Sequence, residues 1–133
     1  MRLQGKNYLI VLKEINVMAS KKKKIVSISI ALLIVLVTSS FISYRIFNVI
    51  NPFSTAYGLI RVIFMEKDYV VVQRSPKVIV AKPNTSLQEY MKSLGFVEDE
   101  ENRMGSLHRF YNDDSVQYVM YSTNMYFSKW IWQ

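Results

Sequence analysis

The stretch "KKKKIVSISIALLIVLVTSSFISYRIF", from Lys21 to Phe47, joins four lysines to a long apolar segment. Between Ile25 and Tyr44 the chain has 20 consecutive residues without a charge. A helix of that length spans roughly 30 Å, which is the thickness of a bilayer's hydrocarbon core. The rest of this short chain is too small to surround such a helix inside a soluble core. The stretch therefore predicts a transmembrane helix over residues 25–44.

The charges beside this helix predict its orientation. Four cations, Lys21, Lys22, Lys23 and Lys24, precede it directly, and Arg45 alone follows it directly. Because positive residues are retained on the cytoplasmic side, residues 1–24 should be cytoplasmic and the C-terminal part extracytoplasmic, in the cell membrane. A cleaved signal peptide is the alternative, but its apolar region spans only about 7–15 residues before a small-residue cut site. An uncut single-pass anchor is therefore expected.

Residues 1–17 have two interpretations. Signal anchors begin with a short basic stretch, and "MASKKKK" from Met18 supplies one. Lys13 and Glu14 can be encoded by a purine-rich ribosome-binding sequence, so the natural chain is hypothesised to start at Met18. The alternative is a disordered or partly helical cytoplasmic tail.

Composition excludes several classes of protein. The net charge of +7 resides in residues 1–45, whereas residues 46–133 carry nine cations and nine acids. A nucleic-acid-binding domain would carry a basic face on its folded part, so no nucleic-acid partner is expected. The chain has no cysteine and one histidine, which excludes disulfides and a Cys/His zinc site within one chain. No cofactor motif is present, and no cofactor is expected.

The juxtamembrane residues 45–65 are also apolar and permit a second interpretation of the topology. If Ile46–Met65 crossed the membrane, the chain would form a hairpin and its C-terminal domain would be cytoplasmic. Arg61 lies well inside that segment, where a charge is costly, and Asn51-Pro52 favours a break. The sequence predicts a short helix after this break, either on the outer membrane surface or packed under the domain.

Residues 66–133 change to short alternating segments, which predict a small α+β domain. Tyr69–Gln73 and Lys77–Ala81 are β-branched runs typical of strands. Ser86 and Glu89 form a capping box for a helix that Gly95 should terminate. Three further strands are expected in "SLHRFY", "VQYVMYS" and "MYFSKWIWQ". The predicted order is β-β-α-β-β-β, with one helix across one face of an antiparallel or mixed sheet.

Aromatic residues concentrate near the C-terminus. A single helix covers one face of a sheet, so the other face should meet solvent, lipid, a second copy or another protein. Core packing with cross-strand aromatic pairs is the alternative. The candidate partner surface consists of Tyr118, Tyr121, Tyr126, Trp130 and Trp132.

Two polar clusters offer alternative chemistry. The acidic run from Glu98 to Glu101 could attract calcium, but it lacks the spacing of a calcium loop and is expected to be a solvated loop. His108, with Asp113 or Asp114, could serve an envelope enzyme such as a small hydrolase. A structural histidine is the alternative, and a non-enzymatic protein is expected.

The segments "DYVVVQRSPKVIVAKP" (68–83), "SLGFVEDEENRMGSLHRFY" (93–111) and "WIW" (130–132) are similar to those of small single-pass membrane proteins of Gram-positive bacilli. The resemblance covers residues 18–133 and implies a plasma-membrane protein whose domain faces the cell wall. It carries over no functional residue. The expected location of the domain outside the cytoplasm therefore predicts a role as a binding, accessory, immunity or regulatory factor of the cell envelope. Its expected partners are the lipid bilayer and an envelope protein, a peptide or itself.

Overall fold

The computed structural model describes residues 2–133, with the side chains of residues 7–133. The chain divides into two compact units, one ending at Thr38 and the other covering Ser39–Gln133, and each is described by itself. The predicted mixture of a long apolar helix and a small α+β domain is confirmed. The helices are α1 (Arg2–Phe47), α2 (Pro52–Ile63) and α3 (Leu87–Ser93). The strands are β1 (Tyr69–Arg74), β2 (Lys77–Ala81), β3 (Val97–Glu98), β4 (Leu107–Tyr111), β5 (Val116–Thr123) and β6 (Ser128–Trp132).

The first unit is helical from residue 2 to residue 38. Within the described residues, α1 is the one helix that is long and apolar enough to cross a membrane. Its apolar side chains are exposed, including those of Ile25, Leu33 and Val37. The hydroxyl of Thr38 donates to the carbonyl oxygens of Ile34 and Val35, at 2.8 and 3.1 Å. This hydroxyl is therefore satisfied by carbonyl groups of its own helix.

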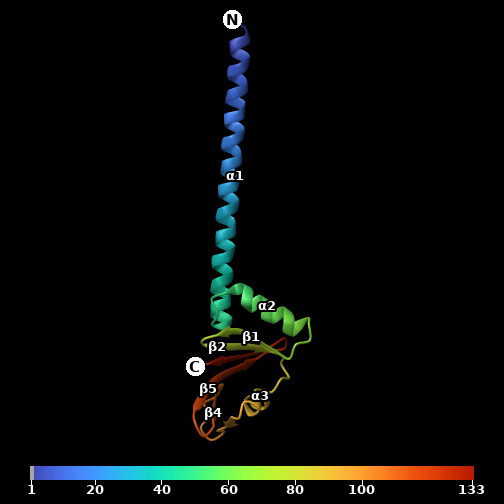
Figure 1. The fold of residues 1–133 in the computed structure, drawn as a ribbon, viewed down its shortest axis with the longest axis vertical. Coiled ribbons are helices and arrows are strands. Elements are labelled where there is room, and N and C mark those ends of the chain that lie inside the picture. The colour runs from blue at the N-terminus through green and yellow to red at the C-terminus, as the bar shows by residue number, and fades with distance from the viewer. Residues whose placement is uncertain (1) are drawn as a thin grey trace. The chain divides into compact units, whose positions relative to one another are not determined.

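The second unit is built on a six-stranded antiparallel sheet with the order β1-β2-β6-β5-β4-β3. Figure 1 shows α2 beside β1 and β2, and α3 nearer to β4. The predicted break at Asn51-Pro52 is confirmed, because Asn51 caps α2 by accepting from the backbone amides of Phe53 and Ser54. The capping box is confirmed in part: Ser86 accepts from the Glu89 amide at 3.1 Å. Gly95 follows α3 at φ 84°, the predicted left-handed conformation.

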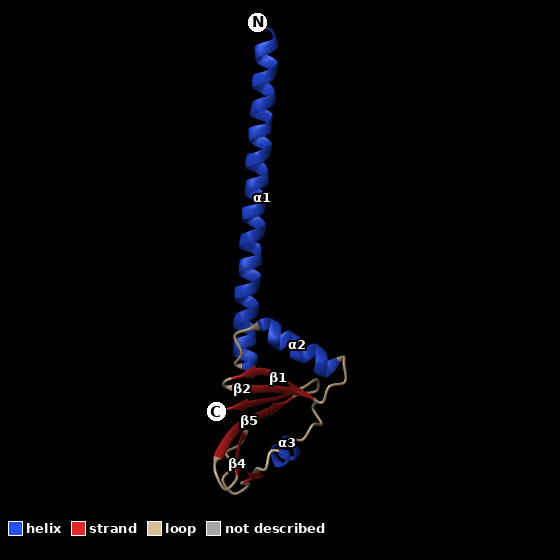
Figure 2. Ribbon diagram, viewed as in Figure 1, coloured by secondary structure: helices blue, strands red, loops and turns tan. Residues whose placement is uncertain are grey.

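Helices pack on both faces of the sheet, in contrast to the expectation of a helix on one face only. On the first face, Ile79, Val119 and Trp130 pack with Leu87 and Met91 of α3. The second face has its own cluster, made of residues from α1, the α1–α2 loop, α2 and the sheet: Phe47, Val49, Val62, Val72, Val78, Val80 and Ile131. The juxtamembrane residues therefore belong to the domain core, and the compact unit begins at Ser39 rather than at the predicted boundary of residue 66. Figure 2 shows helices α2 and α3 flanking the strands.

The five predicted strands are present, although the last one begins at Ser128 rather than at Met125, and the acidic run adds a strand that was not predicted. Val97 and Glu98 form the short edge strand β3, which pairs with Tyr111 and Phe110 of β4. The sequence offered too little alternation there to predict a strand, since two residues show no periodicity. The observed order is therefore β-β-α-β-β-β-β.

Candidate functional site

The predicted aromatic surface does not form one exposed face. Trp130 is completely buried, and Tyr121 and Trp132 are half-buried against the same cluster beneath α3. Tyr121 lies directly opposite Trp130 in the β5–β6 register. The prediction that Trp130 contributes to an open surface is therefore wrong, because α3 covers the side of the sheet on which this residue lies.

Internal partners also occupy two polar groups of this aromatic cluster, whereas the buried Nε1 of Trp130 has no hydrogen-bond partner among the described residues. The indole Nε1 of Trp132 donates to Gln117 Oε1 at 2.8 Å. The ammonium of Lys77 lies 4.5 Å from the ring centroid of Trp132 and donates to the hydroxyl of Tyr90 at 2.7 Å. Such cation–π and hydrogen-bond contacts stabilise the packing of these side chains. Trp132, Lys77 and Tyr90 therefore contribute to the stability of the fold.

The other two predicted residues remain accessible but lie apart. Tyr118 is 39% exposed and pairs with Arg109, on the sheet face opposite to Trp130. Tyr126 is 67% exposed in the turn between β5 and β6, where the Asn124 side chain accepts from its amide at 2.8 Å. The sequence placed Tyr126 in a strand, whereas β6 begins at Ser128. The accessible aromatic residues therefore form two separate positions.

Tyr118 belongs to an uncovered part of the second sheet face. Its neighbours on that face come from β3, β4 and β5, beyond the strands that α2 contacts. We refer to this set as the open sheet face; it comprises Val97, Tyr111, Val116, Tyr118 and Met120, all exposed. Sequence reasoning selected Tyr118 alone from this set, because strand pairing was needed to bring the others beside it.

His108 has a carboxylate partner, but it is neither of the predicted aspartates. Its Nδ1 lies at hydrogen-bond distance, 2.5 Å, from Glu98 Oε1, and the two side chains are 2% and 9% exposed. The ring stacks on Phe110 with centroids 6.2 Å apart. Nε2 is enclosed and has no hydrogen-bond partner within the part of the chain that the structure describes. A substrate cannot reach that nitrogen in this conformation, so the geometry favours a structural pair.

The rest of the acidic run is only partly solvated, contrary to expectation. Asp99 accepts hydrogen bonds from the side chains of Asn102 and Arg109, and these contacts lower the pKa of its carboxyl group. Hydrogen bonding to Tyr118, together with Asp99, raises the pKa of the Arg109 guanidinium. Glu98 and Asp99 thus contact His108 and Arg109, whereas Glu100 and Glu101 are exposed. The described residues contain no group of three acids or histidines arranged for a metal ion.

A buried polar junction connects the end of α1 to α2. The Ser43 hydroxyl donates to the Val49 carbonyl at 2.6 Å and lies 2.8 Å from the Thr55 hydroxyl. On β6, the Lys129 ammonium donates to the Ile46 carbonyl in the last turn of α1, and burial lowers the pKa of this lysine. A cation is favourable at a helix C-terminus. Nothing in the sequence distinguishes Ser43 from the other hydroxyl residues of the apolar run.

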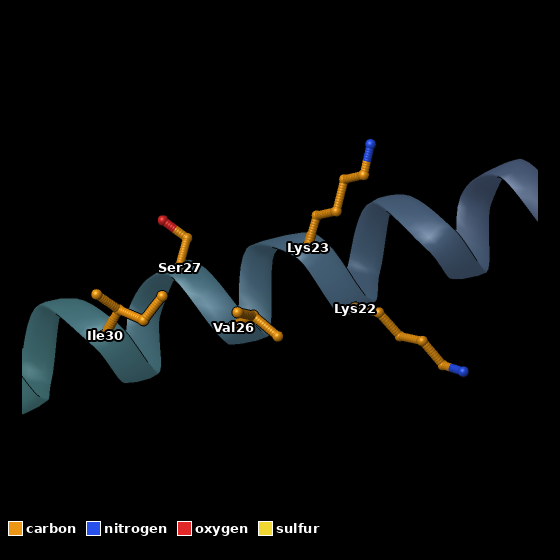
Figure 3. Close-up of a pocket in the computed structure, with 5 residues that line it drawn as sticks. All are labelled: Lys22, Lys23, Val26, Ser27 and Ile30. Carbon is orange, nitrogen blue, oxygen red and sulfur yellow. The ribbon is translucent and has the colours of Figure 1, made fainter.

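The lysine cluster begins the apolar part of α1. Figure 3 shows the side chains of Lys22 and Lys23 extending away from the helix in different directions, beside Val26, Ser27 and Ile30. These residues line a depression of about 400 Å³ on the surface of a single helix. The arrangement lets the charged ends extend away from an apolar helix surface, as lysines at membrane boundaries do.

The chain matches no protein-family model, no curated protein and no solved structure.

Proposed function

We propose that the chain is a single-pass membrane protein with a cytoplasmic N-terminus and an extracytoplasmic domain. The observation that carries this proposal is the uncharged stretch Ile25–Tyr44 in one helix, directly after Lys21–Lys24. An exposed apolar helix surface of this size is unfavourable in water, whereas a bilayer provides the matching surroundings.

The single-pass topology is favoured over a hairpin. Helix α2 has 12 residues and buries Thr55, Gly58 and Val62 against the domain. At ~1.5 Å per residue it is about 18 Å long, short of the roughly 30 Å that a span requires. Its buried face would also have to leave the core cluster of the second sheet face.

A reporter pair at Gln133 tests this topology. Alkaline phosphatase, which is active outside the cytoplasm, should be active in this fusion, and a fluorescent protein that matures only in the cytoplasm should stay dark. The same fusions on a chain with Lys21–Lys24 replaced by glutamine should show a mixed orientation, since the flanking charges set it. Cytoplasmic activity of the unaltered fusion would overturn the proposal.

For its biochemical role, we propose a non-enzymatic binding factor of the cell envelope, in an accessory, immunity or regulatory capacity. Of the predicted surface residues, Tyr118 and Tyr126 are exposed enough to contact another protein. Tyrosines are favourable at such contacts because they combine apolar area with a hydroxyl.

Photo-crosslinking in intact cells tests the binding role. A photoreactive phenylalanine analogue at Tyr118 or Tyr126 should give a discrete crosslinked species, whereas the analogue at Asp113, in the exposed β4–β5 turn, should not. Identification of that species by mass spectrometry distinguishes an envelope protein, a peptide and a second copy of the chain. If all three positions give the same pattern, the two tyrosines have no special binding role.

A further inference from the structure

Helix α2 has an apolar outer face opposite its buried one. The buried face consists of the small or medium-sized residues Thr55, Gly58 and Val62, with Leu59 partly buried beside them. The outward face carries larger side chains at helical spacing, and all of them are exposed: Phe53, Tyr57, Ile60, Ile63 and Phe64. Phe53 and Phe64 are 69% and 78% exposed. The side turned away from the protein is therefore more apolar than the side packed on it.

This arrangement is the reverse of an ordinary surface helix. A helix of a soluble domain buries its apolar stripe and directs charged residues outward. Pro52–Ile63 contains no acidic residue, and its one charged residue, Arg61, has its guanidinium carbon 4.7 Å from the Tyr57 ring centroid. Ile50 and Met65 extend the exposed apolar surface before and beyond the helix. An apolar surface of this extent indicates a partner in the native environment.

Chain connectivity identifies the bilayer as that partner. Four residues separate the end of α1 at Phe47 from Pro52. Even fully extended, this connection reaches about 17 Å, so a chain anchored by α1 keeps α2 near the membrane surface. Apolar and aromatic side chains on one face, with a tyrosine and an arginine at its side, are the composition of helices that lie in the membrane interface.

We propose that α2 lies in the outer membrane interface, with Phe53, Tyr57, Ile60 and Phe64 inserted among the lipids. Arg61 then contacts lipid phosphates, which match its charge. The opposite side of the helix holds the sheet through Gly58 and Val72, so α2 fixes which side of the domain faces the membrane. This inference rests on the proposed membrane anchoring.

Site-specific fluorescence quenching in vesicles tests the proposal, and the absence of native cysteine makes labelling simple. The full chain is reconstituted in vesicles of phosphatidylethanolamine and phosphatidylglycerol. Single cysteines at Phe53, Ile60 or Phe64 carry a small fluorophore. Asp113→Cys in the exposed β4–β5 turn reports solvent, and Leu33→Cys in the apolar part of α1 reports the lipid core.

Lipids that carry a spin label near the headgroup should quench the labels on α2 several-fold more strongly than they quench the label at residue 113. Iodide in the buffer should quench the label at residue 113 more strongly than the labels on α2. If the label at residue 33 is lipid-quenched while those on α2 behave like the label at residue 113, the inference fails and the anchoring stands. If the label at residue 33 is also open to iodide, the anchoring itself fails. Labels on α2 that both quenchers miss would indicate a protein contact and overturn the inference.

A charge substitution separates lipid binding from folding. Phe53→Asp with Phe64→Asp should abolish the lipid quenching measured at residue 60, because carboxylates on this face must leave the lipid. Circular dichroism of the same variant should remain that of the unaltered chain, since both side chains point away from the core. The matched control, Asp113→Asn with Asp114→Asn, should leave the quenching unchanged. Unchanged quenching in the Phe53/Phe64 variant would contradict insertion of this face.

Discussion

Helices α2 and α3 pack on the two faces of one sheet, but they distribute polarity in opposite ways. Helix α3 buries its large residues Leu87 and Met91 and leaves Gln88 and Lys92 exposed. Helix α2 buries Thr55, Gly58 and Val62 and leaves large apolar residues exposed: Phe53, Tyr57, Ile60 and Phe64. An exposed face that is polar on one helix and apolar on the other indicates that the two sides of the domain meet different surroundings.

The two sides also obtain their packing differently. Beneath α3, a large indole ring fills the space between helix and sheet. Beneath α2, the helix approaches so closely that a β-carbon added to Gly58 would lie 2.3 Å from Val72 Cγ1. The first side should therefore be sensitive to the loss of volume and the second to its addition.

The largest effect is expected from Trp130→Ala, beneath α3. Removing this fully buried ring leaves a cavity and should lower the free energy of unfolding by about 3–5 kcal/mol. Tyr126→Ala, at an exposed turn, should change it by less than about 0.5 kcal/mol. Urea denaturation of the two variants measures the difference. Similar stability in both would place Trp130 outside the core.

The buried pair on the same face should give the next largest effect. His108→Leu leaves the Glu98 carboxylate nearly buried without its partner, which costs about 3 kcal/mol for groups of this kind. Glu98→Leu in the same chain should restore most of the lost stability, because the unpaired charge is then absent. A double variant no more stable than His108→Leu would mean that packing, rather than charge, dominates.

The α2 side responds to added volume. Gly58→Ala brings a β-carbon against Val72, and overpacking of this kind costs about 1–3 kcal/mol. The higher helix propensity of alanine offsets about 1 kcal/mol of this. We expect a net loss of about 1 kcal/mol in thermal or chemical unfolding. The control Ala56→Leu adds more volume to the exposed face of α2 and should not destabilise the domain.

The features predicted from sequence are those that local chemistry determines. Three such features follow from residues that are close together in the chain: the length of the apolar run, the start of α2 at Asn51-Pro52 and the N-terminal cap of α3 at Ser86. The first two strands, β1 and β2, were predicted from their β-branched runs. Each of these features is specified by neighbouring residues or by hydrophobicity alone.

The features missed depend on pairing between distant segments. The Glu98–His108 pair requires β3 and β4 to align, and the cover on the second sheet face requires Phe47 and Val62 to reach the sheet. Trp130 was expected on a surface because its sequence neighbours do not show that it lies on the sheet face that α3 covers. The apolar character of residues 45–65 was visible, but hydrophobicity alone does not distinguish a side packed on protein from a side facing lipid.

The smallest effect concerns acid sensitivity at the β3–β4 connection. Hydrogen bonds from Asn102 and Arg109 lower the folded-state pKa of Asp99, so this carboxylate stabilises the fold above its unfolded pKa. The contribution is lost as pH falls through the lowered value, below about pH 4. Asp99→Asn should therefore lower the melting temperature at pH 7 and have less effect at pH 3. Asp113→Asn, in the exposed turn, should show no such trend. If Asp99→Asn lowers the melting temperature equally at both pH values, the ionised carboxylate does not contribute to the stability of this connection.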